Sequence, residues 1–220
     1  MNLNIDEIFI LENGMEQLGI NVFTETLEKF SLFIEELLFW NRRTNLVGTN
    51  NVREIIVKHI LDSLSIYPLL GSGILTILDI GSGAGFPGIP LAVVSNRFKV
   101  TAVEKRSKRA GFLRNTSNIL RLNNFEVIEK DIRDVNSSKK YDVITARGFG
   151  DLLTIYKTAK NYVEVGGMII AFKGKISELE KEVSRLKENV NEDEIRINIE
   201  EVKVPYLDNE ERHVVIIETK

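Results

Sequence analysis

The chain has 220 residues, no cysteine and a formal net charge of −3, and 43% of its residues are hydrophobic. This length accommodates one large domain, or one domain with a small appendage. The absence of cysteine excludes disulfides, cysteine-based zinc sites and thiol nucleophiles, and two histidines are too few for a histidine-rich metal site. No apolar stretch approaches the roughly 20 residues of a membrane span, and residues 1–7 lack the pattern of a secretory signal. We therefore expect a cytoplasmic protein without a bound metal.

Basic residues are concentrated in one segment, although the chain as a whole is slightly acidic. Residues 105–121 contain six Lys and Arg residues and no acidic one, whereas residues 176–201 contain nine acidic residues against four basic ones. The basic segment is either a surface that faces phosphates or a solvated helix face. Charge alone slightly favours the solvated face.

The first seventy residues have the apolar spacing of helices. The spacing is weak over residues 1–20 and strong over 24–40, and a third helix is expected over 52–67, closing at Pro68. This part of the chain contains no nucleotide-binding motif. We interpret residues 1–70 as an N-terminal helical cap.

After about residue 71 the pattern changes to alternating strands and helices. Strands are expected at residues 75–80, 98–104, 125–129, 141–145, 168–172, 195–204 and 213–219. Helices are expected at residues 88–95, 107–121, 151–162 and 177–187. This alternation predicts a parallel sheet with helices on both faces, and the last two strands predict an antiparallel hairpin at its edge. We expect residues 71–220 to form one α/β domain that packs with the cap as one unit.

The centre of the chain is a glycine-rich turn between the first strand and its helix. Gly81, Gly83 and Gly85 occupy alternate positions, and Gly88 opens the helix. Glycine lets the backbone approach a ligand closely, and the start of a helix offers free N–H groups. The turn therefore predicts a nucleotide-like cofactor at the carboxyl end of a parallel strand.

Three classes of protein use such a turn. A P-loop NTPase is excluded because no Gly-Lys-Ser/Thr closes the loop, and the match to the G-x-G-x-x-G pattern of dehydrogenases is weak by itself. Asp79, just before the glycines, can reach the amino group of the methionine part of S-adenosylmethionine. Glu104, at the end of the second strand, can accept the hydroxyls of a ribose in either cofactor. With the terminal hairpin, these features predict the class I S-adenosylmethionine-dependent methyltransferase fold: Rossmann-like, with a seven-stranded, mostly parallel sheet and an antiparallel last strand.

Further segments carry a specific resemblance to a known family. They are Trp-Asn-Arg-Arg-Thr-Asn-Leu at 40–46, Lys-His-Ile-Leu-Asp-Ser-Leu at 58–64, the loop 81–91, Lys108-Arg109, Arg147, Lys173-Gly174 and Glu-Arg-His at 211–213. In this order they resemble the bacterial small-subunit ribosomal RNA guanine-N7 methyltransferases, also called glucose-inhibited division protein B. The resemblance spans most of the chain. Val47-Gly48 and Gly148 depart from the family pattern, and neither lies in the cofactor loop.

The resemblance implies S-adenosylmethionine as cofactor and N7 of a guanine in small-subunit ribosomal RNA as methyl acceptor. That nitrogen carries a lone pair and no proton, so no general base is required. The lack of cysteine argues against carbon-5 methylation of pyrimidines, and residues 145–149 lack the Asn/Asp-Pro-Pro-aromatic signature of amino-group methylation. The expected partner is this RNA, naked or within an assembling subunit, and we expect a monomer. A methyltransferase of another substrate and a non-catalytic module that docks on ribosomes remain open alternatives.

The motifs and the resemblance together assign candidate residues to three roles. The cofactor candidates are Asp79, Gly81, Gly83, Gly85, Phe86, Glu104, Ile132, Arg133 and Arg147. The catalytic candidates are Arg147, Lys173, His59 and Asn45. The candidates for RNA binding are Arg42, Arg43, Lys58, Arg106, Lys108, Arg109 and His213. For His59, Ile132 and His213, an ordinary structural role is the competing interpretation.

Overall fold

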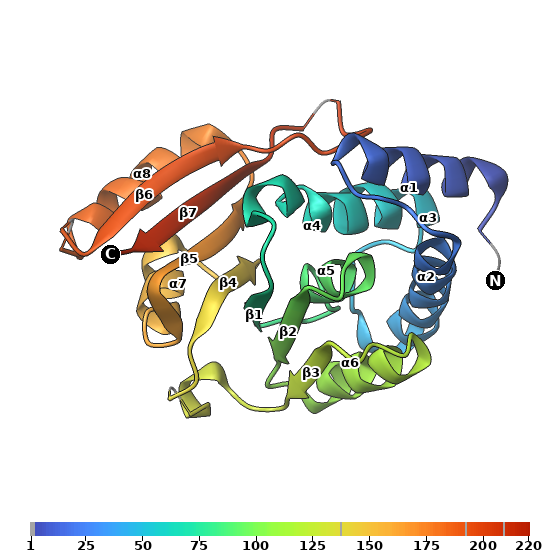
Figure 1. The fold of residues 1–220 in the computed structure, drawn as a ribbon, viewed down its shortest axis with the longest axis horizontal. Coiled ribbons are helices and arrows are strands. Elements are labelled where there is room, and N and C mark those ends of the chain that lie inside the picture. Colours follow the sequence, from blue (N-terminus) through green and yellow to red (C-terminus); the bar gives the residue numbers. More distant parts are fainter. Residues whose placement is uncertain (1–2, 137, 192, 209) are drawn as a thin grey trace.

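A single seven-stranded sheet organises the fold (Figure 1). The computed structural model describes residues 3–136, 138–191, 193–208 and 210–220. The strands are β1 (Leu75–Ile80), β2 (Phe98–Val103), β3 (Phe125–Ile128), β4 (Tyr141–Arg147), β5 (Val163–Lys173), β6 (Ile195–Glu201) and β7 (His213–Thr219). Their order in the sheet is β3-β2-β1-β4-β5-β7-β6; β7 runs antiparallel to β5 and β6, and the other neighbouring strands pair in parallel. This topology confirms the predicted fold class.

The strand order reverses between β1 and β4, which pair in parallel with Ile80 beside Ala146. In open α/β sheets, ligands bind outside the carboxyl ends of the strands at this reversal. The glycine turn follows β1, and Arg147 is the last residue of β4. The topology therefore brings these two predicted features to the same edge of the sheet.

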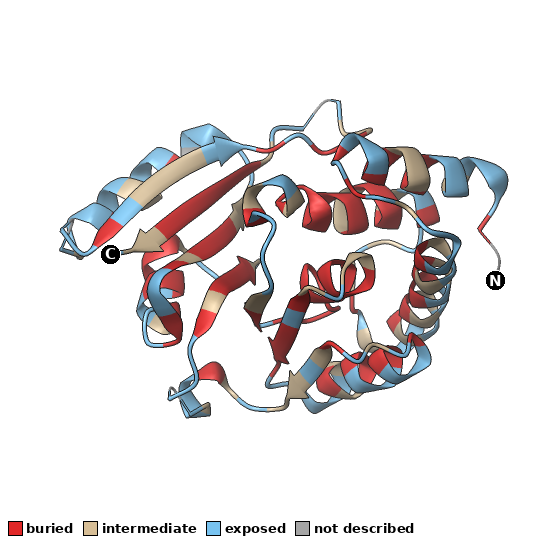
Figure 2. Cartoon of the chain, in the orientation of Figure 1, coloured by how far each residue is buried: buried red, intermediate tan, exposed pale blue. Residues whose placement is uncertain are grey.

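Helices cover both faces of the sheet. They are α1 (Ile5–Gln17), α2 (Thr24–Thr44), α3 (Val52–Ile55), the π-helix η1 (Ile56–Leu61), α4 (Asp62–Leu64), the 3₁₀ turns η2 (Tyr67–Leu70) and η3 (Ile132–Asp134), α5 (Gly88–Val94), α6 (Ser107–Ile119), α7 (Leu152–Ala159) and α8 (Ile176–Lys187). One buried apolar cluster joins the sheet to α1, α2, η1, α4, α5 and α6, and a second joins the other face to α7 and α8. Figure 2 shows the inner strands as mostly buried (red) and the outward faces of α2 and α8 as exposed.

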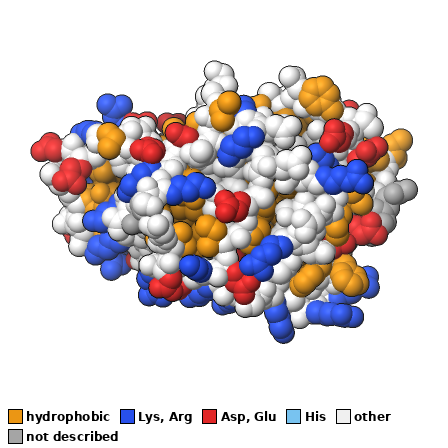
Figure 3. All heavy atoms as spheres, turned by 60° about the horizontal axis from the view of Figure 1, so that its bottom comes forward, with side chains coloured by type: hydrophobic (Ala, Val, Ile, Leu, Met, Phe, Trp, Pro, Cys, Tyr) orange, Lys and Arg blue, Asp and Glu red, His pale blue; other side chains and the backbone are white. Residues whose placement is uncertain are grey.

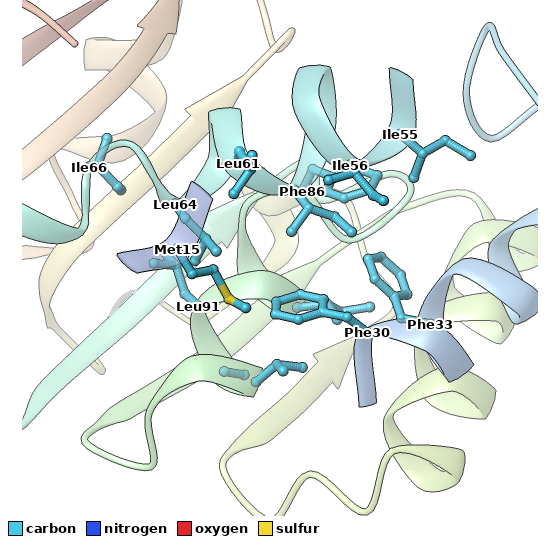
Figure 4. Packing of buried hydrophobic residues seen from close by; sticks show 14 of the residues in the cluster. Met15, Phe30, Phe33, Ile55, Ile56, Leu61, Leu64, Ile66, Phe86 and Leu91 are labelled. Carbon is cyan, nitrogen blue, oxygen red and sulfur yellow. The ribbon is translucent and has the colours of Figure 1, made fainter. Parts of the chain in front are cut away.

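The predicted cap shares its core with the sheet domain. Phe30 and Phe33 of α2 are fully buried, and the Phe33 ring lies 5.3 Å from the Phe86 ring of the glycine loop. Figure 4 shows these side chains converging with Met15 and Leu91. Residues before and after position 70 therefore pack in one cluster, and the division there remains a prediction.

Two of the predicted cap helices end elsewhere. α2 continues to Thr44, and Asn45 closes the helix in the left-handed conformation with φ of 46°, its N–H bonded to the carbonyl of Asn41. The third helix ends at Leu64, and Tyr67–Leu70 forms a separate 3₁₀ turn that contains Pro68. Within the described residues, none of the helices is both long and apolar enough to cross a membrane.

Candidate active site

A pocket of about 420 Å³ lies beside the glycine turn at the carboxyl edge of the sheet. This volume falls in the range of small-molecule sites. Its lining comes from Gly81, Val103, Glu104, Lys105, Arg106, Arg109, Lys130, Asp131, Ile132, Arg133, Gly148, Phe149, Thr154 and Thr158. Four of the predicted cofactor residues, Gly81, Glu104, Ile132 and Arg133, thus meet in one pocket.

Both the backbone conformation at position 81 and the neighbouring Phe149 require glycine there. Its φ is +67°, a left-handed value that favours glycine, and an added Cβ would lie 2.6 Å from Cδ2 of Phe149. Phe149 therefore packs directly on the turn inside the pocket. Nothing in the sequence around Phe149 signalled this contact, because it depends on the pairing of β1 with β4.

Glu104 ties the end of β2 to the glycine turn. Its Oε2 accepts a hydrogen bond from the amide of Gly83 at 3.0 Å, and its Oε1 accepts one from the amide of Arg106 at 2.8 Å. The side chain is 5% exposed. Each carboxylate oxygen has a second lone pair, so Glu104 retains capacity to accept ribose hydroxyls.

Asp79 lies beneath the turn rather than at its surface, since only 1% of the residue is exposed. Its Oδ1 accepts a hydrogen bond from the Thr145 hydroxyl at 3.0 Å, and its Oδ2 has no hydrogen-bond partner among the described residues. Burial raises the pKa of Asp79 to about 6. Asp79 thus supports the loop from below, and its predicted contact with a cofactor stays untested.

The turn after β3 carries two of the predicted cofactor residues, Ile132 and Arg133. Asp131 caps this turn through the amide of Arg133, and it also pairs with the Arg133 guanidinium at 2.7 and 2.9 Å. This pairing lowers the pKa of Asp131. Ile132 is 5% exposed and packs in the second apolar cluster, which supports its interpretation as a core residue. The same residue also lines the pocket.

Arg147 and His59 meet on the other side of the turn. Nη2 of Arg147 donates to the carbonyl of Lys58 at 2.7 Å and lies 3.0 Å from Nδ1 of His59 and 3.2 Å from Oδ2 of Asp62. The ring of Phe86 stacks on His59 with centroids 5.1 Å apart and lies 5.6 Å from the Arg147 guanidinium carbon. The glycine loop is therefore in contact with both catalytic candidates through Phe86.

His59 is electrically neutral in this setting. Burial, together with the nearby charge of Arg147, lowers the pKa of His59 to about 4. Because a guanidinium has only donors, Nδ1 of His59 is the acceptor in this contact. A neutral imidazole at position 59 can therefore accept a hydrogen bond from Arg147.

Lys173 supports the loop that follows β4. Its Nζ donates to the carbonyl of Gly150 at 2.9 Å and pairs with Glu182 of α8 at 2.7 Å. The same Glu182 accepts a hydrogen bond from the amide of Leu152 at 2.8 Å. Lys173 therefore holds the segment that carries Phe149, and its predicted catalytic contact remains untested.

The candidates for RNA binding fall in different surroundings. Arg106 and Arg109 line the pocket beside the glycine turn, whereas Lys58 forms an ion pair with Glu210 at 2.7 Å. His213 is 7% exposed and its Nδ1 lies 2.8 Å from the carbonyl of Gly174, which favours the structural interpretation over RNA contact. Arg42, Arg43 and Lys108 are exposed.

Asn45 lies in a separate hollow formed by the end of α2 and the loop after it. Residues lining this hollow include Arg42, Asn45 and Asn50, and the buried amide of Asn41 holds the loop by bonding to Asn50 and to the amide of Val47. Asn45 does not line the pocket beside the glycine turn. The structure therefore separates this catalytic candidate from the cofactor pocket.

Comparison with known proteins places this site in a family. The family model described as rRNA small subunit methyltransferase G matches residues 26–215. The chain belongs to the rRNA small subunit methyltransferase G family. It is 36% identical over 173 residues to a Borrelia turicatae protein named Ribosomal RNA small subunit methyltransferase G, covering 78% of this chain and 83% of the relative. A protein of the same name from Acetivibrio thermocellus is 34% identical over 174 residues, covering 77% and 72% of the two chains.

Solved structures confirm the fold of this member of the methyltransferase G family. A SAM-dependent methyltransferase from Aquifex aeolicus superposes with a TM-score of 0.56 at 20% identity, covering 76% of this chain and 93% of that one. A methyltransferase from Pyrococcus furiosus gives a TM-score of 0.58 at 16% identity, covering 84% and 96%. At these identities the likeness concerns the fold, and it confirms the fold class predicted from the sequence.

Proposed function

We propose that this protein transfers a methyl group from S-adenosylmethionine to N7 of a guanine in small-subunit ribosomal RNA. Family membership supports the RNA class, because the relatives carry the name Ribosomal RNA small subunit methyltransferase G. The observation that carries the proposal is Arg147. Its side chain is held between the cofactor loop and the helical cap with hydrogen-bond donors left over.

The pocket residues fit the proposed cofactor. Ile132 gives an apolar wall that suits an adenine, and Glu104 can accept the hydroxyls of a ribose. Gly81 has no side chain, so the cofactor can approach the backbone of the turn closely. The guanidinium of Arg109, whose Nη1 lies 3.4 Å from where a Cβ on Gly83 would be, would offer donors to a carboxylate. When bound, S-adenosylmethionine supplies an activated methyl group and a neutral thioether leaving group.

The residues around Arg147 suit a base that attacks through a ring nitrogen. In the transfer, the N7 lone pair forms the bond to the methyl carbon, the carbon–sulfur bond breaks, and its electron pair stays on sulfur. No proton moves in this step, so it requires no general base. Guanine presents O6 and N7 as acceptors, so a donor from Arg147 to O6 would orient the base and leave N7 free.

The charge around the pocket suits a polyanion. Five of its lining residues are basic (Lys105, Arg106, Arg109, Lys130, Arg133) and two are acidic (Glu104, Asp131), a local net charge of +3. This local surplus contrasts with the chain's net charge of −3. Phosphates of the RNA near the pocket mouth would therefore be attracted locally, with little sequence preference.

Transfer of labelled methyl groups separates the proposal from its alternatives. The purified protein is incubated with labelled S-adenosylmethionine and, in parallel, naked small-subunit RNA, intact small subunits, total protein and small-molecule extract. Label in RNA supports the proposal, and label only in protein or small molecules indicates another substrate. Cofactor binding without transfer to any fraction indicates a non-catalytic docking module. Comparing naked RNA with subunits also identifies the form of the substrate.

A further inference from the structure

Three segments distant in the sequence meet at Asp62, where their charged side chains form a chain of ion pairs that alternate in sign. Arg147 ends β4, Asp62 opens α4, and Arg212 immediately precedes β7. Oδ2 of Asp62 lies 3.2 Å from Nη2 of Arg147, and Oδ1 of Asp62 accepts a hydrogen bond from Nε of Arg212 at 3.1 Å. Glu210 extends the chain, pairing with Arg212 and with Lys58 at 2.7 Å each.

Asp62 is the centre of this chain. The residue is 4% exposed, and each of its carboxylate oxygens faces a different guanidinium group. Burial raises the pKa of Asp62, and the charges of Arg147 and Arg212 oppose that rise. A buried carboxylate without partners would be costly, so the two arginines and Asp62 depend on one another.

All three guanidinium nitrogens of Arg212 donate hydrogen bonds within the protein. Its Nε bonds to Asp62, its Nη2 to Glu210, and its Nη1 to the carbonyl of Glu211 at 3.0 Å. Arg147 differs, because its Nη2 takes several partners, while Nη1 has only a long contact of 3.5 Å to the Ser63 hydroxyl. Nε of Arg147 has no partner among the described residues.

The ion pairs of this chain alternate in sign around Arg147. Two anions (Asp62, Glu210) join three cations (Lys58, Arg147, Arg212), and the charge of Glu54 also acts on Lys58. Each nitrogen of Arg212 has a partner within the protein, whereas Nε of Arg147 has none among the described residues. The network therefore engages mainly Nη2 of Arg147, and N–H groups of its Nε and Nη1 remain able to bind an acceptor.

We propose that Asp62 and Arg212 are positioning residues that hold Arg147 in the orientation in which it binds the methyl-accepting base. This proposal rests on the proposed function. Neither residue touches substrate, and both act through Arg147. The isosteric change Asp62→Asn removes the carboxylate charge between the two guanidinium groups, so the orientation of Arg147 is expected to loosen.

A double-mutant cycle on single-turnover methyl transfer to small subunits tests this coupling. Asp62→Asn is expected to lower the rate constant about tenfold or more, without a change in cofactor affinity. In an Arg147→Ala background, where no guanidinium remains to be positioned, the same change is expected to cost less than twofold. If Arg147→Ala brings the rate below detection, Arg147→Lys serves as the background with the same expectation.

Two further variants keep the outcome interpretable. Asp142→Asn removes another partly buried carboxylate, which bonds to the amide and hydroxyl of Thr76 at 2.7 Å, and is expected to leave transfer unchanged. Arg212→Gln replaces Asp62→Asn in the cycle if the latter does not fold. The positioning role is overturned if Asp62→Asn lowers the rate constant as much in the Arg147→Ala background as in wild type. It is also overturned if Asp62→Asn does not lower the rate constant in wild type. Full transfer by Arg147→Ala overturns instead the role of Arg147 in the proposed function.

Discussion

At the residue scale, His59 is a partly buried titratable group in direct contact with Arg147. His59 stacks on Phe86 and accepts from Arg147, and its pKa is lowered to about 4. A protonated His59 would repel Arg147 and would lose its acceptor nitrogen. The site therefore works with imidazole rather than imidazolium at neutral pH.

This state predicts a specific loss of stability in mild acid. The folded pKa of His59 lies below the unfolded value of 6.5, so the unfolded chain binds more protons as the pH falls from 6.5 towards 4. Between pH 7 and pH 5, wild type should lose about 2 kcal/mol of unfolding free energy relative to His59→Gln. Denaturant unfolding at both pH values measures this. An equal loss in both proteins would show that His59 titrates normally.

Asp79 predicts the opposite pH dependence. Its folded pKa of about 6 lies above the unfolded value of 3.8, so the folded chain binds more protons between these values and stability falls as the pH rises through them. Relative to Asp79→Asn, wild type should lose about 1 kcal/mol between pH 5 and pH 8 in the absence of cofactor. Thermal unfolding of both proteins across this range provides the test, and a constant difference would contradict the buried, unpaired Oδ2.

The sequence predicted some residues of the site and missed others. Gly81 and Glu104 follow from the turn and from the end of a strand, since both positions are fixed by local pattern. Phe149 and Arg109 enter the pocket only when β1 pairs with β4 and α6 packs beside the turn, so no local pattern identifies them. Asp62 lies within the segment 58–64 that carries the family resemblance, but the sequence assigns it no role, because its two arginine partners are distant in the chain.

At the element scale, the loop between β4 and α7 links the cofactor pocket to α8. Gly148 and Gly150 both have positive φ values, and Phe149 between them packs on Gly81. Lys173 and Glu182 hold this loop at Gly150 and Leu152. The position of Phe149 over the turn therefore depends on an ion pair between β5 and α8.

Loss of this ion pair is expected to weaken cofactor binding. Lys173→Met should raise the dissociation constant for S-adenosylmethionine about threefold to tenfold, since one hydrogen bond to a charged group is worth about 1.5–3 kcal/mol and part of it is recovered by water. Isothermal titration measures this change, and Lys181→Met, an exposed site on α8, is the control. Unchanged cofactor affinity with lost methyl transfer would instead assign Lys173 directly to the substrate.

Most elements agree with the sequence pattern, and the exceptions have physical causes. β1 and β7 match their predicted bounds, because strand patterns bounded by Gly or polar residues are locally defined. β5 begins at Val163, five residues early, since its first part, which contains Gly166 and Gly167, pairs with β4 across an irregularity near Tyr141. The π-helix η1 interrupts a helix that the apolar spacing predicted as regular, and periodicity alone does not reveal such a turn.

At the scale of the whole molecule, basic residues of the cap and of the sheet domain are brought close together. Asn115 of α6 bonds to Glu36 of α2 at 2.9 Å, and Trp40 of α2 packs edge-on against Phe112 of α6 at 5.9 Å. The two helices therefore run antiparallel, which places the carboxyl end of α2 beside the amino end of α6. Figure 3 shows Lys and Arg side chains (blue) spread over the face in view, several of them along its lower margin, with acidic side chains (red) among them.

This arrangement predicts salt-dependent RNA binding by a defined surface. Replacing Arg42, Arg43 and Lys108 together with alanine should weaken RNA binding and lower the slope of log affinity against log salt by about 2–3. Cofactor affinity should not change. The matched control replaces Lys181, Lys187 and Arg196, three exposed basic residues of α8 and β6. Equal effects of the two triple variants would show that net charge alone, rather than this surface, determines binding.

The identity of the methylated atom tests the account most directly. Small subunits that lack the modification are incubated with the purified protein and S-adenosylmethionine, and their RNA is digested and analysed by mass spectrometry against nucleoside standards. We expect 7-methylguanosine, reduced about a hundredfold by Arg147→Ala while the affinity for the cofactor is retained. A methyl group on any other atom, or full formation of 7-methylguanosine by the Arg147→Ala variant, would contradict the account.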